Sequence, residues 1–413
     1  MSTDATREPG GYEESARQDA TIPAPHSERR SRFLLAVGLV FVFGPAVAYV
    51  GGARAHEIEN RRLAAFPSVS DGWKFFPELN AWANDHLPLR DRAIKTNTSL
   101  SESVFGQTPQ YGDQSAGIGP VAPSSTGSSD MRDYPHVIQG KDSWLFYGSD
   151  IQNACTPVAT LDDALAGLQR FTDIVERSGR KVVFTIAPDK SEMNPQFMPD
   201  DYLGKDCAPP ARAKLWARMA NNPPSSYVDI KQPLADLAAR STTSLWRKHD
   251  THWATRGAAV YAERVIDAIR PGMWKPSELT SIGPVQRQGD LSVLLGTPVK
   301  DTYPGYVVKR PGVTVTKSVE SLLSAQSTDA PLIHGGLILG DSFTQASRDL
   351  LAPFFDHARI LHPKTATATP QALASVIKGA KVIVLEIVER DMVAGNVPIA
   401  DKTFLNDLEV TLR

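Results

Sequence analysis

The sequence predicts an α/β fold, in which a doubly wound, mostly parallel sheet is preceded by one transmembrane helix. Helical segments alternate with short apolar runs that have the length and composition of buried strands. One such run, Leu337–Leu339, ends abruptly in Gly340-Asp341-Ser342. A further run of eighteen uncharged residues, Phe33–Val50, is long enough to cross a bilayer core of about 30 Å.

The composition excludes several classes of protein. The chain has 413 residues, of which 41% are hydrophobic and 22% charged, as in an ordinary globular protein. Its net charge of -2 gives no electrostatic reason to bind nucleic acid. With only two cysteines, it is neither a disulfide-rich scaffold nor a multi-cysteine zinc protein.

The N-terminal region predicts a membrane anchor at residues 33–53, with residues 1–32 as a disordered cytoplasmic tail. Three arginines immediately before the apolar run place the N-terminus inside and the remainder outside (Arg29, Arg30, Arg32). The alternative is a cleaved signal peptide, since Ala53-Arg54-Ala55 resembles a cleavage site. The long leader favours a retained single-pass anchor.

Residues 54–132 read as a helical connector followed by a flexible linker, and residues 133–413 as the folded catalytic domain. Within that domain the patterns predict these elements in order: a two-stranded turn at 137–147, a helix after Thr160, a strand at 180–187, a helix at 211–219, a strand at 227–230, a helix at 258–269, strands at 337–339 and 358–361, a helix at 371–378 and a strand at 381–387.

Ser342 is a candidate nucleophile. Open α/β sheets place their sites at the carboxyl ends of the strands, and Gly340 permits a sharp turn there. A serine in this position becomes a nucleophile when a histidine and a carboxylate can reach it. The alternative is a serine that only caps a helix.

Asp250 and His252 are candidates for the base and its orienting carboxylate. On an extended segment, side chains two positions apart point to the same face. A carboxylate bonded to one ring nitrogen leaves the other free to accept a proton from a serine. Trp253 would shield the pair or stack on a sugar. Two alternatives are a metal site that includes His249 and a pair that merely caps the following helix.

Together the motifs resemble the SGNH-hydrolase-like polysaccharide O-acetyltransferases of the alginate acetylation type, the AlgJ/AlgX group. The similarity begins near residue 57 and follows the family order through Glu59-Asn60-Arg61 with Leu63 and Phe66-Pro67, Asp85-His86-Leu87-Pro88-Leu89-Arg90, Gly140-Lys141-Asp142-Ser143-Trp144-Leu145-Phe146, Pro188-Asp189-Lys190, Asp250-Thr251-His252-Trp253 and Gly340-Asp341-Ser342-Phe343.

This resemblance implies an SGNH-like catalytic domain with Ser342 as nucleophile, His252 as base and Asp250 as its partner. It implies no cofactor and no metal. A polysaccharide would be the acceptor, and a multi-pass membrane O-acyltransferase would supply acetyl groups outside the cytoplasm. The further oxyanion blocks of ordinary SGNH esterases are missing, so only the Ser342 N–H is expected to bind the oxyanion.

Other residues are predicted around this site. Gly340, Asp341, Trp253, Lys190 and Arg390 are candidates for the oxyanion hole or the substrate rim, and Glu389-Arg390 reads as solvated surface charge. In an oxidising compartment, Cys155 and Cys207 are expected to form a disulfide that closes about fifty residues.

The residues leave three functions open. In the first, a sugar hydroxyl resolves an acetyl-serine, giving an O-acetyltransferase. In the second, water resolves it, giving an acetylesterase. The third is a non-catalytic glycan-binding scaffold of a membrane complex. The resemblance favours the transferase.

Overall fold

The computed structural model describes residues 134–412, so the predicted tail, anchor and connector lie outside the described residues. No helix among the described residues is both long and apolar enough to span a bilayer. This described part of the chain contains ten strands: β1 (Val137–Gln139), β2 (Leu145–Tyr147), β3 (Lys181–Ala187), β4 (Leu279–Gln288), β5 (Lys300–Val308), β6 (Val313–Val319), β7 (Leu322–Ser327), β8 (Gly336–Leu339), β9 (Ala358–Leu361) and β10 (Val382–Val388).

Helices are interspersed among these strands, except between β5 and β8. They are α4 (Ser149–Cys155), α5 (Leu161–Arg177), α6 (Lys190–Met193), α7 (Ala208–Asn221), α8 (Lys231–Arg240), α9 (Thr255–Ile269), α10 (Asp290–Leu294), α11 (Ser342–Leu351), α12 (Pro363–Thr367), α13 (Pro370–Gly379), α14 (Glu389–Ala394) and α15 (Lys402–Leu412).

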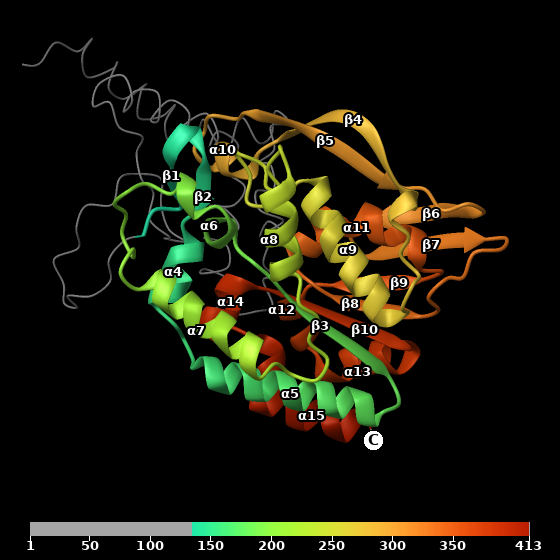
Figure 1. Cartoon of the computed structure of the whole chain (residues 1–413). Helices are drawn as coiled ribbons and strands as arrows, with labels where there is room; N and C mark the ends of the chain where they lie inside the picture. The colour runs from blue at the N-terminus through green and yellow to red at the C-terminus, as the bar shows by residue number, and fades with distance from the viewer. Residues whose placement is uncertain (1–133, 413) are drawn as a thin grey trace, which may run out of the picture. The chain divides into compact units, whose positions relative to one another are not determined.

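A six-stranded sheet in the order β3-β10-β8-β9-β7-β6 organises the domain. The first four strands are parallel, whereas β7 and β6 continue the sheet antiparallel. Helices α5, α13 and α15 lie on one side of it, and α8, α9 and α11 on the other (Figure 1). The described residues therefore have the predicted α/β architecture, with an antiparallel edge that the sequence patterns did not reveal.

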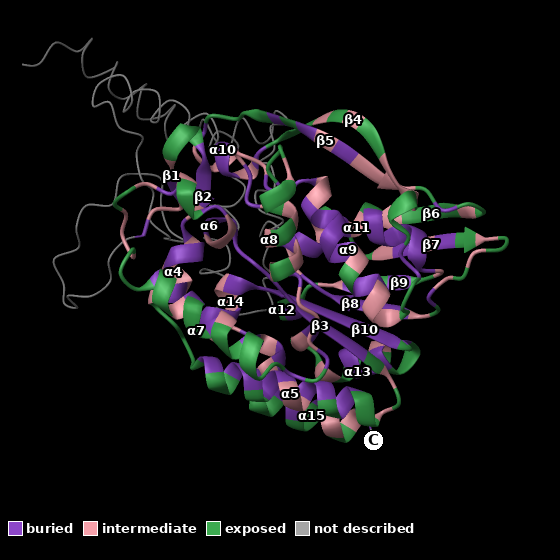
Figure 2. Cartoon of the chain, in the orientation of Figure 1, coloured by how far each residue is buried: buried purple, intermediate pink, exposed green. Residues whose placement is uncertain are grey.

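The parallel strands are buried on both faces, as crossover helices require. Every residue of β8 and β10 is buried, including Glu386 in the middle of an otherwise apolar strand. Purple strands at the centre of Figure 2 are flanked by helices whose outer faces are green. The register pairs Leu339 with Leu385 and Leu361, so the carboxyl ends of these strands form one edge.

Most predicted helices and strands are confirmed within a few residues. The cap prediction at Thr160 is one of them, since its hydroxyl accepts the N–H of Asp163 at 3.0 Å at the start of α5. The strand predicted at 227–230 is wrong, because only Tyr227 forms a bridge, to Phe184. Asp229 ends the extended stretch by accepting the N–H of Lys231 at 3.0 Å, which starts α8.

Cys155 and Cys207 form the predicted disulfide, with their Cα atoms 5.3 Å apart. Cys155 ends α4, and Cys207 immediately precedes α7. The bridge therefore links two helices that each contribute a buried polar side chain, Asp150 from α4 and Arg212 from α7.

Candidate active site

The turn Gly340-Asp341-Ser342, named the nucleophile turn after its candidate nucleophile, connects β8 to α11. Ser342 is the first residue of α11 and partly exposed, and Asp341 caps the helix by accepting the N–H of Phe343 at 2.8 Å. Gly340 is required by close approach, because a Cβ there would lie 2.1 Å from the hydroxyl oxygen of Thr344. The turn thus presents Ser342 at the carboxyl edge of the sheet.

The buried side chain of Glu386 on β10 is hydrogen-bonded to this turn. Oε2 of Glu386 accepts the main-chain N–H of Asp341 at 3.0 Å and the hydroxyl of Thr344 at 2.9 Å. The hydroxyl of Thr344 lies 3.0 Å from that of Tyr261 on α9. Burial, reinforced by the charge of Asp341, raises the pKa of Glu386 well above its ordinary value. The nucleophile turn is therefore held by a buried, hydrogen-bonded carboxyl group whose surroundings favour its neutral form.

Asp250 and His252 contact one another through a turn rather than through an extended strand. Oδ1 of Asp250 accepts the main-chain N–H of His252 at 2.8 Å and lies 2.9 Å from its ring Nδ1. The same-face argument is therefore wrong in its geometry, although the pairing is present. The capping alternative is also wrong, because Ala254 precedes α9 and no side chain caps that helix.

The His252 ring lies beside the nucleophile turn. It lies 5.1 Å from that of Phe343, the residue after Ser342, measured between centroids. Its Nε2 is buried and has no hydrogen-bond partner among the described residues, so it does not contact Ser342 in this structure. Catalytic hydrogen bonds are often long or absent without substrate. An unpaired buried ring nitrogen is what a base awaiting a proton would present.

His249 does not join this pair. Its Nδ1 lies 2.7 Å from Oδ1 of Asp301, and its main-chain N–H donates to Oδ2 of Asp301 at 2.9 Å. The predicted alternative of a metal site that includes His249 is therefore not supported by the geometry. Asp290 on α10 approaches His252 instead, with its Oδ2 3.4 Å from Nδ1.

Arg247 also contacts the acid–base pair and was not anticipated from the sequence. Its Nη2 lies 2.6 Å from Oδ1 of Asp250. Burial alone would raise the pKa of Asp250, but the hydrogen bond from His252 and the charges of His252 and Arg247 lower it below its ordinary value. Burial alone would lower the pKa of His252, but Asp250 and Asp290 outweigh it and raise the pKa.

Comparison with known proteins then identifies the family. Residues 137–356, just over half of the chain, match the model of the family described as SGNH hydrolase-like domain, acetyltransferase AlgX. The chain belongs to this family. The matched segment includes Asp250, His252 and Ser342 and confirms the resemblance seen in the motifs.

Curated relatives of the chain include two proteins named probable alginate O-acetylase AlgJ. The one from Pseudomonas syringae pathovar tomato is 27% identical over 167 residues, which cover 39% of this chain and 41% of the relative. The one from Pseudomonas putida is 27% identical over 141 residues, covering 33% and 34%. The alignments thus span about two fifths or less of these relatives.

A solved structure that resembles the chain is the O-acetyltransferase domain of Pseudomonas putida AlgJ. It has 18% sequence identity and a TM-score of 0.43, and the match covers 63% of this chain and 93% of that one.

Lys190 was predicted at the substrate rim of this family member, but its side chain is buried. Its Nζ donates to the main-chain carbonyl oxygens of Lys248 at 2.8 Å and Asp250 at 2.9 Å. The ammonium group also lies over the rings of Trp144 and Phe146. Burial lowers the pKa of Lys190 to about 7, against the opposing pull of Asp250 and other carboxylates. Its contacts position the acid–base segment.

Arg390 is likewise not the solvated charge that the sequence suggested. Its Nη1 lies 2.8 Å from Asp189 and 3.5 Å from Asp150, and both carboxylates are fully buried. Its guanidinium lies 5.9 Å from the centre of the Phe343 ring. Glu389 is also fully buried and accepts the indole N–H of Trp216 at 2.7 Å. These charges form a buried network beside the nucleophile turn.

The remaining rim candidates have structural partners. Trp253 is 2% exposed and donates its indole N–H to Ser347 at 2.9 Å, so it shields the site and is not open to a sugar. The N–H of Gly340 donates to Leu361 at 3.1 Å, and that of Asp341 to Glu386. Neither N–H is therefore open to an oxyanion.

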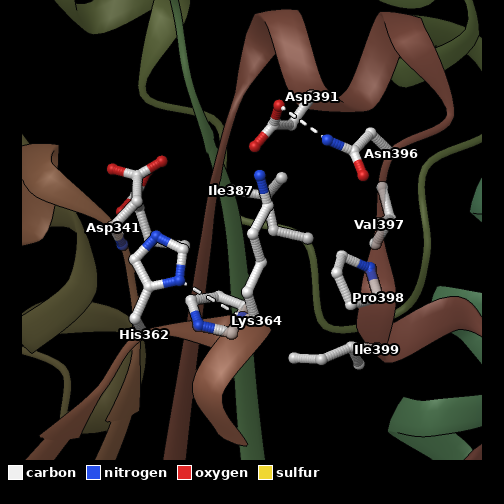
Figure 3. A pocket seen from close by; sticks show the side chains of 11 residues that line it. Asp341, His362, Lys364, Ile387, Asp391, Asn396, Val397, Pro398 and Ile399 are labelled. Carbon is white, nitrogen blue, oxygen red and sulfur yellow. Dashed lines mark hydrogen bonds between the residues drawn. The ribbon is translucent and has the colours of Figure 1, made fainter. Parts of the chain in front are cut away.

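A small cavity of about 20 Å³ lies beside the nucleophile turn and has room for about one water molecule (Figure 3). Asp341, His362 and Asp391 are among its lining residues. Burial lowers the pKa of His362 and raises that of Asp391. A space of this size does not hold an acetyl donor in this structure.

Proposed function

We propose that the protein is an O-acetyltransferase that moves an acetyl group to hydroxyls of a polysaccharide through an acetyl-serine on Ser342. Membership of an acetyltransferase family supports the reaction class. The observation that carries the proposal is the unpaired Nε2 of His252, which is buried beside the nucleophile turn while Nδ1 is bonded to Asp250.

The chemistry divides into two acyl transfers. In the first, His252 Nε2 removes the Ser342 proton as Oγ attacks the donor's acetyl carbon, and the leaving group then takes that proton. In the second, His252 removes the proton of a sugar hydroxyl that attacks the acetyl-serine, and Ser342 regains the proton. Both steps form an oxyanion.

The main-chain N–H of Ser342 is the proposed donor to that oxyanion. It is the first N–H of α11, and no acceptor among residues 134–412 is paired with it. The first N–H groups of a helix lack partners within the helix and favour negative charge. A tetrahedral oxyanion next to Oγ would lie within reach of this donor.

The location and the partner belong to the same proposal. The apolar run at residues 33–50 and the disulfide between Cys155 and Cys207 favour an anchored protein with its catalytic domain outside the cytoplasm. A multi-pass membrane O-acyltransferase is the proposed acetyl donor. A C-terminal alkaline phosphatase fusion tests the orientation, because this reporter is active only outside the cytoplasm; an inactive, full-length fusion contradicts it.

The experiment for the activity supplies a chromogenic acetyl ester, which replaces the partner as donor, and a panel of oligosaccharides to the full-length chain. Mass spectrometry follows free acetate and acetylated sugar. We expect acetylated sugar from the wild type and from Ser318→Ala, whose hydroxyl contacts Asp349 on the surface, but none from Ser342→Ala. Sugar acetylation by Ser342→Ala would refute the mechanism, and acetate alone, with no acetylated sugar, would indicate an esterase.

A further inference from the structure

A second carboxylate approaches the same ring nitrogen that Asp250 binds. Oδ2 of Asp290 lies 3.4 Å from Nδ1 of His252, on the short helix α10, which follows His252 by almost forty residues. Oδ1 of Asp250 already accepts the main-chain N–H of His252 and contacts Arg247. The N–H at Nδ1 of His252 therefore lies near two carboxylates. That of Asp250 already contacts several donors, whereas that of Asp290 does not contact Arg247.

The chain fixes Asp290 in this place through reciprocal hydrogen bonds. Its Oδ1 accepts the N–H of Thr251 at 2.7 Å, and its own N–H donates to Oδ2 of Asp250 at 3.2 Å. A Cβ on Gly289 would lie 2.1 Å from the carbonyl oxygen of His249, so only glycine permits this approach. The N–H of Ser292 donates to the same carbonyl at 3.2 Å.

The charges around the ring give Asp290 a distinct role. Arg247 contacts Asp250 at 2.6 Å and offsets its negative charge. Nζ of Lys190 donates to main-chain oxygens of the 248–250 segment, and Asp301 on β5 is hydrogen-bonded to His249. Of the carboxylates that face His252 from these elements, Asp290 is the one paired with no lysine or arginine among the described residues. Burial and the charge of Asp250 raise the pKa of Asp290, and the charge of His252 opposes them.

We propose that Asp290 is a positioning residue for the proposed acetyl transfer: it holds the His252 ring and stabilises the imidazolium that forms when Ser342 or a sugar hydroxyl loses its proton. The inference rests on the proposed function for the use of the imidazolium. The contact between Asp290 and His252 is present without substrate, so it is independent of that function.

The alternative use of these atoms is a metal site, since ligand atoms of Asp250, His252 and Asp290 lie within 4.8 Å of one another. The guanidinium of Arg247 is already bound to Asp250, and a divalent cation added at this distance would be strongly repelled. The geometry thus favours a hydrogen-bonded pair of carboxylates. The experiment keeps the metal as an outcome that would overturn the proposal.

The first measurement needs no turnover. NMR follows the pH titration of the His252 ring in the full-length chain, identified by the signal that His252→Gln removes. Asp290→Asn keeps an oxygen for Thr251 but removes the charge, so we expect the His252 midpoint to fall by about one pH unit. An unchanged midpoint in folded Asp290→Asn would overturn the proposal, whatever reaction the enzyme performs.

The second measurement asks whether catalysis uses this coupling. Stopped-flow acetylation by a chromogenic ester is recorded against pH. We expect the acidic limb of Asp290→Asn to move to lower pH and its plateau rate to fall about tenfold, with KM for the ester unchanged. A slower reaction with an unmoved limb would mean a purely structural role.

Two further arms complete the test. Gly289→Ala keeps every charge but displaces Asp290, so we expect the same direction of shift in the His252 midpoint. Chelation by EDTA should leave the wild-type rate unchanged. A rate lost to EDTA and restored by Zn²⁺ would replace the proposal with a metal site. Failure of Ser342→Ala to abolish acetylation would instead reject the proposed function and leave the titration result standing.

Discussion

Nζ of Lys190 donates a 2.9 Å hydrogen bond to the main-chain carbonyl of Asp250, sixty residues away in the sequence. A second bond to Lys248 makes this buried ammonium group a support for the segment that carries His252. The segment of the acid–base pair is thus held by a lysine as well as by Asp290.

Replacing Lys190 with Met should destabilise the protein and slow acetylation. The buried carbonyl of Asp250 would lose its donor, at about 1–3 kcal/mol, whereas that of Lys248 would keep the N–H of Leu145. The His252 segment would loosen. Thermal unfolding and acetylation rates measure both effects. Lys141→Met is the control, since its partner Asp200 is fully exposed, and we expect no resolvable change in Tm. A Lys190→Met protein as stable and active as wild type would contradict the assigned role.

Replacing Glu386 with Gln should be tolerated, whereas Leu should not. Burial raises the pKa of Glu386 well above its ordinary value, which favours the neutral carboxyl group, and Gln preserves its acceptor oxygen. Leu leaves the Asp341 N–H without its acceptor and leaves the Thr344 hydroxyl with Tyr261 alone, which costs about 2 kcal/mol or more. Equilibrium unfolding in urea compares the variants. Equal losses for Gln and Leu would show that the carboxyl group is ionised.

Glu389 should make the protein less stable as pH rises. Burial, with the charge of Glu192, raises the pKa of Glu389 to about 7 despite Arg212. The folded state therefore binds this proton more tightly than the unfolded state, so the stabilisation is complete below about pH 4.5 and is lost as pH rises to about 7. Glu389→Gln removes that contribution.

The measurement for Glu389 is the free energy of unfolding at several pH values across that window. We expect the wild-type value to fall more steeply with pH than the Glu389→Gln value. Parallel curves would mean that Glu389 has an ordinary pKa in the folded protein. Glu176, which is exposed on α5, provides a control through Glu176→Gln.

Reducing the disulfide should lower the stability of the domain. Cys155 and Cys207 are 52 positions apart, and closing a loop of that length restricts the unfolded chain by about 4 kcal/mol. Thermal unfolding with and without dithiothreitol measures the difference, and the double variant Cys155→Ala with Cys207→Ala should reproduce the reduced protein. An identical Tm under both conditions would contradict the expectation.

The parallel strands were predictable because each leaves a local signature. The residues of β10 are apolar except for Glu386, and Thr160 is a recognisable N-cap at the start of α5. The ribbon of β4 and β5 and the hairpin of β6 and β7 leave no such signature, because no residue of β4 or β6 is buried and the residues of all four strands are mixed in polarity.

The candidate site was predictable where its chemistry is local. Asp250 and His252 are two positions apart, and Ser342 follows an apolar strand. The predicted exposure of Lys190 and Arg390 was wrong because their partners are distant in the sequence. Arg390, for example, binds Asp150, which lies 240 positions away. Charge alone does not tell a buried ion pair from a solvated side chain, so only the fold reveals that these residues support the site.

The central claim is an acetyl group carried by Ser342, and peptide mapping by mass spectrometry tests it most directly. The full-length chain is mixed with an acetyl ester without acceptor, quenched in acid and digested. We predict one acetyl group on the peptide containing Ser342, its loss when acceptor glycan is added before the quench, and its absence from Ser342→Ala. Acetylated glycan that forms while this peptide stays unmodified, or an acetyl group carried on another residue, would contradict the account.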